Sequence, residues 1–149
     1  MEYELCIREA EAQDAAALVA FLDLVGQETD FTSLDENGIL MTESEIAGVL
    51  NITAEQRIRI RHIGDIFLVI QRKFWNHGLG SILLEEGIEW AKTSGVLRRL
   101  QLSVQKRNEA AIHLYSKFGF VTEGLQERGA YLEEGIFLDV YLMGRLIDK

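Results

Sequence analysis

The sequence predicts an α+β fold in which a central mixed sheet carries helices on both of its faces. Two observations support this prediction. Stretches with the two-residue period of strands alternate along the chain with stretches of helical period, and capping residues and glycines mark the ends of the helical stretches. Because 149 residues suffice to bury one hydrophobic core, we expect a single domain over residues 1–149.

Composition limits the classes of function. With 48% hydrophobic and 26% charged residues, the chain has the make-up of a soluble globular protein. It contains no apolar run long enough to span a membrane and does not start with a basic region followed by an apolar one, so we expect a cytoplasmic protein without a membrane partner. The net charge of -9 argues against nucleic acid and favours cationic partners. The single Cys6 lies in an apolar strand pattern, and we expect it in the core.

The chain begins with a strand and a helix. Alternation over residues 3–9 predicts the strand, and Asp14 is placed to cap a helix that ends at Gly26. Residues 27–38 then lose periodicity and gain acidic side chains, among them Glu28. Such a loop either meets a cationic substrate or is simply solvated.

The next residues give conflicting signals. Thr42-Glu43-Ser44-Glu45 is a capping box, which predicts the start of a helix, whereas residues 47–52 already have the pattern of a strand. A one-turn helix cannot pass into a strand without connecting residues. We therefore hypothesise that a segment is missing from the sequence near Ile46.

Strands and helices alternate through the rest of the chain. The predicted elements are strands over residues 47–53 and 57–70, a helix from Leu79 that ends at Gly95, a strand over residues 99–104, a helix from the cap Asn108 to Phe118 with a stop at Gly119, and closing strands over residues 120–125 and 135–146. Phe137 and Tyr141 in the last strand belong either to the core or to a homodimer interface.

A turn that contains two glycines is the main local signal. Trp75-Asn76-His77-Gly78-Leu79-Gly80-Ser81 joins a strand-like stretch to a helix-like one. The first N–H groups of a helix lack intrahelical partners and carry positive character, and glycine lets an anion approach the main chain. The turn is either an anion site or an ordinary connection. Basic residues cluster at 72–73 and 106–107, either by chance or because a polyanionic ligand binds near both places.

A second motif follows in the helix capped by Asn108. Asn108 and Tyr115 share one face of that helix by their spacing, so both can address the same cavity. Together the two motifs resemble the GCN5-related N-acetyltransferase (GNAT) superfamily, in which a strand, a G-x-G turn and a helix are followed by an N-x-x-A-x-x-x-Y-x-x-x-G-F run. The resemblance covers most of the chain from Ala47 onward.

The resemblance implies a fold, a reaction and a cofactor. The fold is a twisted, mostly antiparallel mixed sheet with helices on both faces. The reaction is transfer of the acetyl group of acetyl-CoA to a primary amine by direct attack in a ternary complex. The acceptor is then an amine-bearing small molecule, such as a polyamine, or a protein amine. No spacing of His, Cys and Asp suggests a metal.

The resemblance also implies roles for residues. Backbone groups of Leu68, Val69 and Ile70 would pair with the pantetheine arm, and an N–H group of this strand would bind the oxyanion. The pyrophosphate would bind the turn, where the cofactor-binding residues are Trp75, Asn76, His77, Gly78, Leu79, Gly80 and Ser81. Asn108 and Tyr115 would also contact the cofactor, and Tyr115 would donate a proton to the leaving thiolate.

The general base is less well defined. Asp65 stands where relatives often carry a carboxylate that acts through water, and Glu28 is its rival; either is equally suited to a structural role. Two features depart from the family pattern. Trp75 stands where many relatives have Arg or Gln, and the region at Ile46 lacks a helix and a strand that relatives keep there.

Two other classes of function remain open. One is a catalytically inactive module of the same fold that binds and senses acyl-CoA, against which the presence of Tyr115 argues. The other is a nucleotide-binding protein, which would use the glycines for another phosphate ligand. The sequence lacks both the Lys-Ser/Thr of a P-loop and the spacing of a dinucleotide fingerprint.

Overall fold

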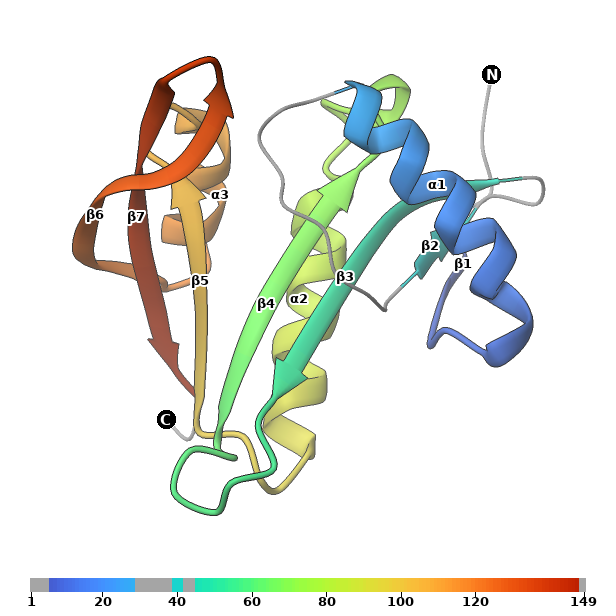
Figure 1. Cartoon of the computed structure of the whole chain (residues 1–149). Helices are drawn as coiled ribbons and strands as arrows, with labels where there is room; N and C mark the ends of the chain where they lie inside the picture. The colour runs from blue at the N-terminus through green and yellow to red at the C-terminus, as the bar shows by residue number, and fades with distance from the viewer. Residues whose placement is uncertain (1–5, 29–38, 42–44, 148–149) are drawn as a thin grey trace. The chain divides into compact units, whose positions relative to one another are not determined.

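The computed structural model describes residues 6–28, 39–41 and 45–147, and for residues 27, 28 and 39–41 it describes the backbone alone (Figure 1). The chain forms two compact units. Unit 1 comprises Met1–Ile52 and Phe67–Gly87, and unit 2 comprises Thr53–Ile66 and Ile88–Lys149. The single domain expected over residues 1–149 stays a prediction.

Helices and strands are mixed along the chain. In order they are β1 (Cys6–Arg8), the 3-10 turn η1 (Ala12–Asp14), α1 (Ala15–Glu28), β2 (Ile39–Met41), β3 (Ile46–Ala54), β4 (Ile63–Ile70), the 3-10 turn η2 (Arg72–Phe74), α2 (Leu79–Thr93), β5 (Arg99–Gln105), α3 (Glu109–Lys117), β6 (Val121–Glu133) and β7 (Ile136–Leu146). Among these described helices, none has both the length and the apolar character needed to cross a membrane.

The strands form a mixed sheet. Hydrogen bonds connect them in the order β1-β2-β3-β4-β5-β7-β6. The pairs β1–β2, β2–β3, β5–β7 and β6–β7 are antiparallel, whereas β4–β5 is parallel. The predicted α+β class with a mixed, mostly antiparallel sheet is therefore confirmed.

In unit 1, helices cover both faces of β3 and β4 (Figure 1). On one face α1 packs against the strands, and the buried residues there are Leu18, Phe21, Val25, Ile46, Val49 and Val69. On the other face the start of α2 and the turn before it bury Ala47, Phe74, Leu79 and Leu83. Burying an aliphatic or aromatic side chain contributes roughly 1.5–3 kcal/mol, so these two clusters hold the helices on the strands.

The boundaries of α1 differ from the prediction. Asp14 does not cap α1 but ends the preceding turn η1, and α1 begins at Ala15. Gly26 does not stop the helix, which continues to Glu28. A glycine commonly ends a helix by adopting a positive φ, and Gly26 is not among the residues that do so. The acidic loop expected after α1 lies, from residue 29 to residue 38, outside the described residues.

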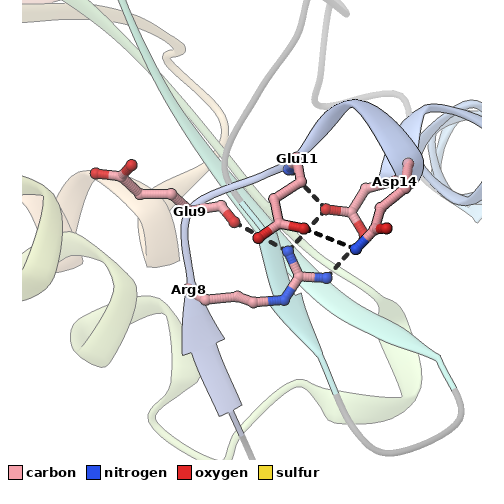
Figure 2. Close-up of polar contacts among 5 residues, drawn as sticks. Arg8, Glu9, Glu11 and Asp14 are labelled. Carbon is pink, nitrogen blue, oxygen red and sulfur yellow. Dashed lines mark hydrogen bonds and ion pairs between the residues drawn. The ribbon is translucent and has the colours of Figure 1, made fainter.

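Asp14 instead pairs with Arg8 at the end of β1 (Figure 2). Arg8 donates from Nη1 to Oδ2 and from Nη2 to Oδ1 of Asp14, both at 2.7 Å. The backbone N–H of Glu11 donates a third hydrogen bond, also at 2.7 Å, to Oδ2. The hydrogen bonds from Arg8 and then from Glu11 lower the pKa of the Asp14 carboxyl to about 2. The carboxylate therefore joins β1 to the start of α1.

We expect Asp14→Asn to lower the melting temperature, because an amide cannot accept both hydrogen bonds from Arg8. Folding lowers the pKa of Asp14 from 3.8 to about 2, so the stabilisation by the carboxylate is complete above the unfolded pKa and is lost as the pH falls through the folded one. Thermal unfolding at several pH values tests this. The difference between wild type and variant should shrink toward pH ~2. Asp23→Asn, on the exposed side of α1, is the control, and a pH-independent difference for Asp14→Asn would contradict the assignment.

The capping box at residues 42–45 does not start a helix at Glu45. Residues 42–44 lie outside the described part of the chain, Glu45 forms a bend, and β3 begins at Ile46. Met41 of β2 pairs with Ile46 in an antiparallel register. A strand therefore starts at Ile46, and the missing segment inferred near this residue stays a hypothesis. Lys73 and Glu45 form an ion pair, with Nζ 2.5 Å from Oε1.

Two further expectations were wrong. The strand predicted over residues 57–70 begins only at Ile63, because residues 57–62 form turns in which Arg61 N–H donates to the carbonyl of Arg57 at 2.9 Å. The strand was expected because Arg57, Arg59 and Arg61 alternate with isoleucines, but Ile58 is 74% exposed, so this Arg/Ile alternation marks no buried face. Cys6, expected in the core, is exposed because β1 is a short strand at the edge of the sheet.

In unit 2, β5 pairs with β7 along its whole length, and β6 and β7 form a hairpin. The helix predicted after β5 is confirmed. The side chain of Asn108 accepts a hydrogen bond from Ala111 N–H at 3.2 Å, and Gly119 follows the helix with a φ of 86°. β6 runs to Glu133, beyond the predicted end at Leu125, and its pairing with β7 contains register shifts.

Candidate functional site

The turn between β4 and α2 is held by two buried anchors. Phe74 and Leu79 pack in the core on the α2 face, and residues 75–78 between them are exposed. Asn76 and Gly78 adopt positive φ angles of 65° and 76°. The anchors therefore present a short stretch of left-handed backbone to the solvent at the start of α2.

This backbone is suited to an anion. Left-handed residues that alternate with others turn successive N–H groups toward one concave side, which is the geometry of an anion-binding nest. The first N–H groups of α2, from Leu79 onward, have no intrahelical partners and lie at the positive end of the helix dipole. The first turn of α2 carries no acidic residue, so no carboxylate there opposes a bound phosphate.

Trp75 fastens this turn to β4. Its indole Nε1 donates a hydrogen bond to the carbonyl of Ile70 at 2.8 Å. The guanidinium of Arg72 lies over the indole ring, 5.4 Å from its centroid. Arg72 thus brings a guanidinium to the head of the turn.

The last residues of β4 have an edge without a strand partner. Gln71 N–H donates to the carbonyl of Ala47 in β3 at 2.8 Å. Since backbone groups of successive residues point to opposite sides of a strand, those of Ile70 and Leu68 point away from β3. The ladder between β4 and β5 covers Ile63 to Asp65 only. Within the described chain, the edge at residues 68–70 is therefore open on that side.

Val69 differs from its two neighbours. By the same alternation its backbone groups point toward β3, and its side chain is buried in the cluster under α1. Of the three residues expected to pair with a pantetheine arm, Leu68 presents its N–H and carbonyl at the open edge. Ile70 presents its N–H there, because its carbonyl already accepts from Trp75 Nε1. Val69 faces β3 instead.

The clusters of basic residues are partly explained by local pairing. Lys73 pairs with Glu45, and Arg107 Nε donates to Gln105 Oε1 at 2.9 Å. Lys106 is exposed. In each cluster, at 72–73 and at 106–107, at least one basic side chain therefore has a local partner.

Tyr115 is buried in unit 2, with 8% of its surface exposed. Its ring meets Phe120 edge-on, with centroids 5.8 Å apart. Burial raises the pKa of the phenol to about 12, so the hydroxyl keeps its proton throughout the neutral range. Asn108 begins the same helix, and its Oδ1 is used in the cap. The amide nitrogen of Asn108 is the part of that side chain left to meet a ligand.

The two candidate bases are in different positions. Asp65 is on the exposed side of β4, where its Oδ1 accepts a hydrogen bond from Gln101 Nε2 at 2.9 Å. Glu28 ends α1, and its side chain lies outside the described residues. Sequence reasoning did not single out Gln101. The available signal was its place on β5 between the buried Leu100 and Leu102, which puts its side chain on the opposite face.

The predicted site residues fall in both units. Unit 1 holds residues 68–70 and the turn of residues 75–81, and unit 2 holds Asp65, Asn108 and Tyr115. Unit 1 thus brings together the open strand edge and the anion-binding turn, which are only a few residues apart in the chain. Unit 2 brings together Asp65 and Gln101 across the β4–β5 pair.

Comparison with known proteins shows the family. A model of the Acetyltransferase (GNAT) family matches residues 5–120, which include both motifs. The chain belongs to this family. A GNAT-family acetyltransferase from Streptococcus pneumoniae has a solved structure that is 58% identical, with a TM-score of 0.92, and the match covers 97% of this chain and 100% of that one. The GNAT resemblance and fold expected from the sequence are therefore confirmed.

Two further known proteins resemble the chain. The L-amino acid N-acetyltransferase AaaT of Escherichia coli (strain K12) is 33% identical over 104 residues, which are 70% of this chain. The aligned part spans 64% of that relative's length, less than two thirds. The structure of yncA from Salmonella typhimurium, which contains its cofactor acetyl-CoA, is 18% identical, has a TM-score of 0.83 and covers 98% of this GNAT chain and 95% of that one. At this identity the likeness shows the shared fold alone.

Proposed function

We propose that the protein is an N-acetyltransferase that transfers the acetyl group of acetyl-CoA to a primary amine by direct attack in a ternary complex. The observation that carries the proposal is the exposed turn at Asn76 and Gly78, which follows a strand with an open edge. A CoA thioester has a diphosphate and an extended arm with amide groups. These two parts match an anion-binding turn and an open strand edge. Family membership supports the same reaction class.

In the proposed complex acetyl-CoA binds mainly through main-chain groups. The pantetheine amides pair with Leu68 and Ile70 at the edge of β4, as an added strand would. The diphosphate accepts hydrogen bonds from the N–H groups of residues 77–81 at the start of α2. The amide nitrogen of Asn108 adds a contact to the cofactor. No metal takes part in this mechanism.

We expect Trp75→Phe to weaken CoA binding while the protein stays folded. Phe keeps an aromatic ring but removes the donor to the Ile70 carbonyl, and this frees the turn from β4. A hydrogen bond of this kind contributes about 0.5–1.5 kcal/mol, so the dissociation constant should rise by roughly two- to tenfold. Isothermal titration calorimetry with CoA measures it. Trp90→Phe, on the exposed side of α2, is the matched control, and equal affinities for Trp75→Phe and wild type would contradict the role.

Each step of the reaction has a candidate group. The acceptor ammonium gives a proton to Asp65, for which Glu28 is the rival, and the free amine attacks the thioester carbonyl carbon. A backbone N–H at the β4 edge stabilises the oxyanion. The C–S bond then breaks, the sulfur takes the phenolic proton of Tyr115, and the nitrogen loses its second proton to solvent. Tyr115 recovers its proton from solvent.

The acidity of Tyr115 limits how it acts. A thiol has an ordinary pKa of ~8.5, far below the value of about 12 for this buried phenol, so complete proton transfer to a solvated thiolate is unfavourable. Desolvation raises the pKa of a leaving thiolate in the same way as that of the phenol. Tyr115 therefore gives its proton to the thiolate while the sulfur is still desolvated, as the C–S bond breaks.

The acceptor class follows from charge and from the relatives. The net charge of -9 favours a cationic amine over an acidic one. One relative is named for acetylation of L-amino acids. We therefore include small amines, amino acids, polyamines and peptide amines among the acceptors, and place the protein in the cytoplasm where acetyl-CoA is present.

A thiol-release assay tests the function. The protein is mixed with acetyl-CoA and each amine of a panel, and free CoA is detected; at least one amine should accelerate release. Calorimetry with CoA, ATP and NAD runs in parallel. Binding of CoA without turnover on any amine would favour the sensing module, and stabilisation by ATP or NAD but not by CoA would overturn the proposal.

A further inference from the structure

Four polar side chains of unit 2 form a continuous hydrogen-bonded series across three strands. Asp65 on β4 accepts from Gln101 on β5, at 2.9 Å. Gln101 Oε1 in turn accepts from Arg99 Nε at 3.1 Å. Arg99 makes a two-point ion pair with Glu123 on β6, with Nη1 3.0 Å from Oε2. One end of the series is therefore a candidate catalytic carboxylate, and the other end is a structural ion pair.

The series fixes the orientation of the Gln101 amide. An arginine side chain has only donors, so the group of Gln101 that faces Arg99 must be its carbonyl oxygen. The NH₂ group of the same amide then faces Asp65, as observed. In this arrangement Gln101 acts toward Asp65 only as a donor, and its NH₂ group bonds to Oδ1 of Asp65. Oδ2 of Asp65 is left to take a proton.

Strands β6 and β7 leave room for the ion pair between Arg99 and Glu123. Gly144 on β7 lies between the two partners, opposite Gln101 on one side and Val121 on the other. A Cβ at Gly144 would lie 2.6 Å from Arg99 Nη2 and 2.6 Å from Glu123 Oε1, so the glycine leaves room for the two side chains in their present positions. The register shift between residues 122 and 124 makes Glu123 the extra residue of a bulge, which can turn its side chain toward Arg99.

Both members of the pair are charged. The hydrogen bond with Glu123 raises the pKa of Arg99, and the same contact lowers the pKa of Glu123. The Arg99 side chain is only 25% exposed and is paired with Glu123, so it lies along the sheet surface and does not extend into the solvent. Arg99 is thus a fixed donor for Gln101.

We propose that Gln101 is a positioning residue that holds the Asp65 carboxylate in one orientation for proton transfer from the acceptor amine, with Arg99, Glu123 and Gly144 as its support. This inference rests on the proposed function, since it takes Asp65 as the base. Gln101 does not touch the reacting atoms and acts only through Asp65. A carboxylate on an exposed strand surface would otherwise sample several rotamers, and misplacement of a catalytic group lowers the rate.

A double-mutant cycle on kcat tests the inference, with Gln101→Met, Asp65→Asn and the combined variant. Methionine has nearly the length of glutamine but no donor. Gln101→Met should lower kcat about tenfold with KM for acetyl-CoA unchanged. In the Asp65→Asn background it should have no further effect, because no base remains to be positioned. Gln56→Met, at an exposed position after β3, is the matched control and should keep the wild-type kcat.

The outcomes separate the inference from the function. If Asp65→Asn keeps full activity, the assignment of the base in the proposed function fails. If Asp65→Asn is slow but Gln101→Met is not, or if the two effects multiply, the positioning role alone is overturned. If circular dichroism shows that Gln101→Met does not fold, Glu123→Gln replaces it. This variant weakens the ion pair that holds Arg99, and Glu123 is exposed, so the substitution should not disturb the core. It should lower kcat less, and again only when Asp65 is present.

Discussion

Replacing Tyr115 with Phe should lower kcat for amine acetylation by about 10²–10⁴, the usual contribution of a positioned proton donor. The substitution removes only the hydroxyl, and the ring keeps its edge-on contact with Phe120. Binding of acetyl-CoA through the strand edge and the turn should be nearly unchanged. A large fall in kcat with a nearly constant KM is therefore expected in steady-state kinetics.

We expect Tyr115→Phe to be about as stable as the wild type, so a lower kcat would not result from unfolding. Phenylalanine keeps the buried ring and its contact with Phe120, so the variant should keep the fold. Tyr131→Phe, with a tyrosine that is 63% exposed, is the matched control and should retain activity. Full activity of Tyr115→Phe would exclude the phenol from the reaction and favour water as the proton source.

The sequence predicted those features whose cause lies within a few residues. Asn108 caps α3 with its own side chain, and Gly119 and Gly95 follow helices with positive φ angles of 86° and 74°. In each case one residue acts on backbone next to it, so the local sequence contains the whole cause. The strand–turn–helix unit at residues 63–93 was predictable for the same reason, and with it half of the candidate site.

Features that depend on distant partners were missed. The capping box predicted a helix, but the strand that starts at Ile46 pairs with β2, and this pairing satisfies backbone groups of both strands. The Arg/Ile alternation of residues 57–62 falls on turns and not on a strand. Gln101 meets Asp65 only through the register between β4 and β5. Sequence periodicity indicates which face a side chain occupies, but the register between strands decides which side chains meet.

Replacing Gly78 with Ala should reduce affinity for CoA by about tenfold or more, a loss of roughly 1.4 kcal/mol of binding free energy. Gly78 has a φ of 76°, and no atom lies within 4 Å of the place where a Cβ would stand. The substitution therefore meets no steric clash in the protein itself. Alanine either keeps the left-handed conformation at a cost of about 1–2 kcal/mol or relaxes and turns its N–H groups away from the nest. The methyl group also approaches the bound diphosphate.

Gly95→Ala separates the loss of binding from the loss of stability. Gly95 follows α2 with a φ of 74° and, like Gly78, has no atom within 4 Å of a Cβ. Both variants should lose a similar amount of thermal stability, because the strain of a left-handed alanine is the same at the two positions. Only Gly78→Ala should weaken CoA binding in calorimetry. If both variants bound CoA as tightly as the wild type, the diphosphate would have to lie elsewhere, because a turn that tolerates a side chain at Gly78 cannot be the one that encloses the phosphates.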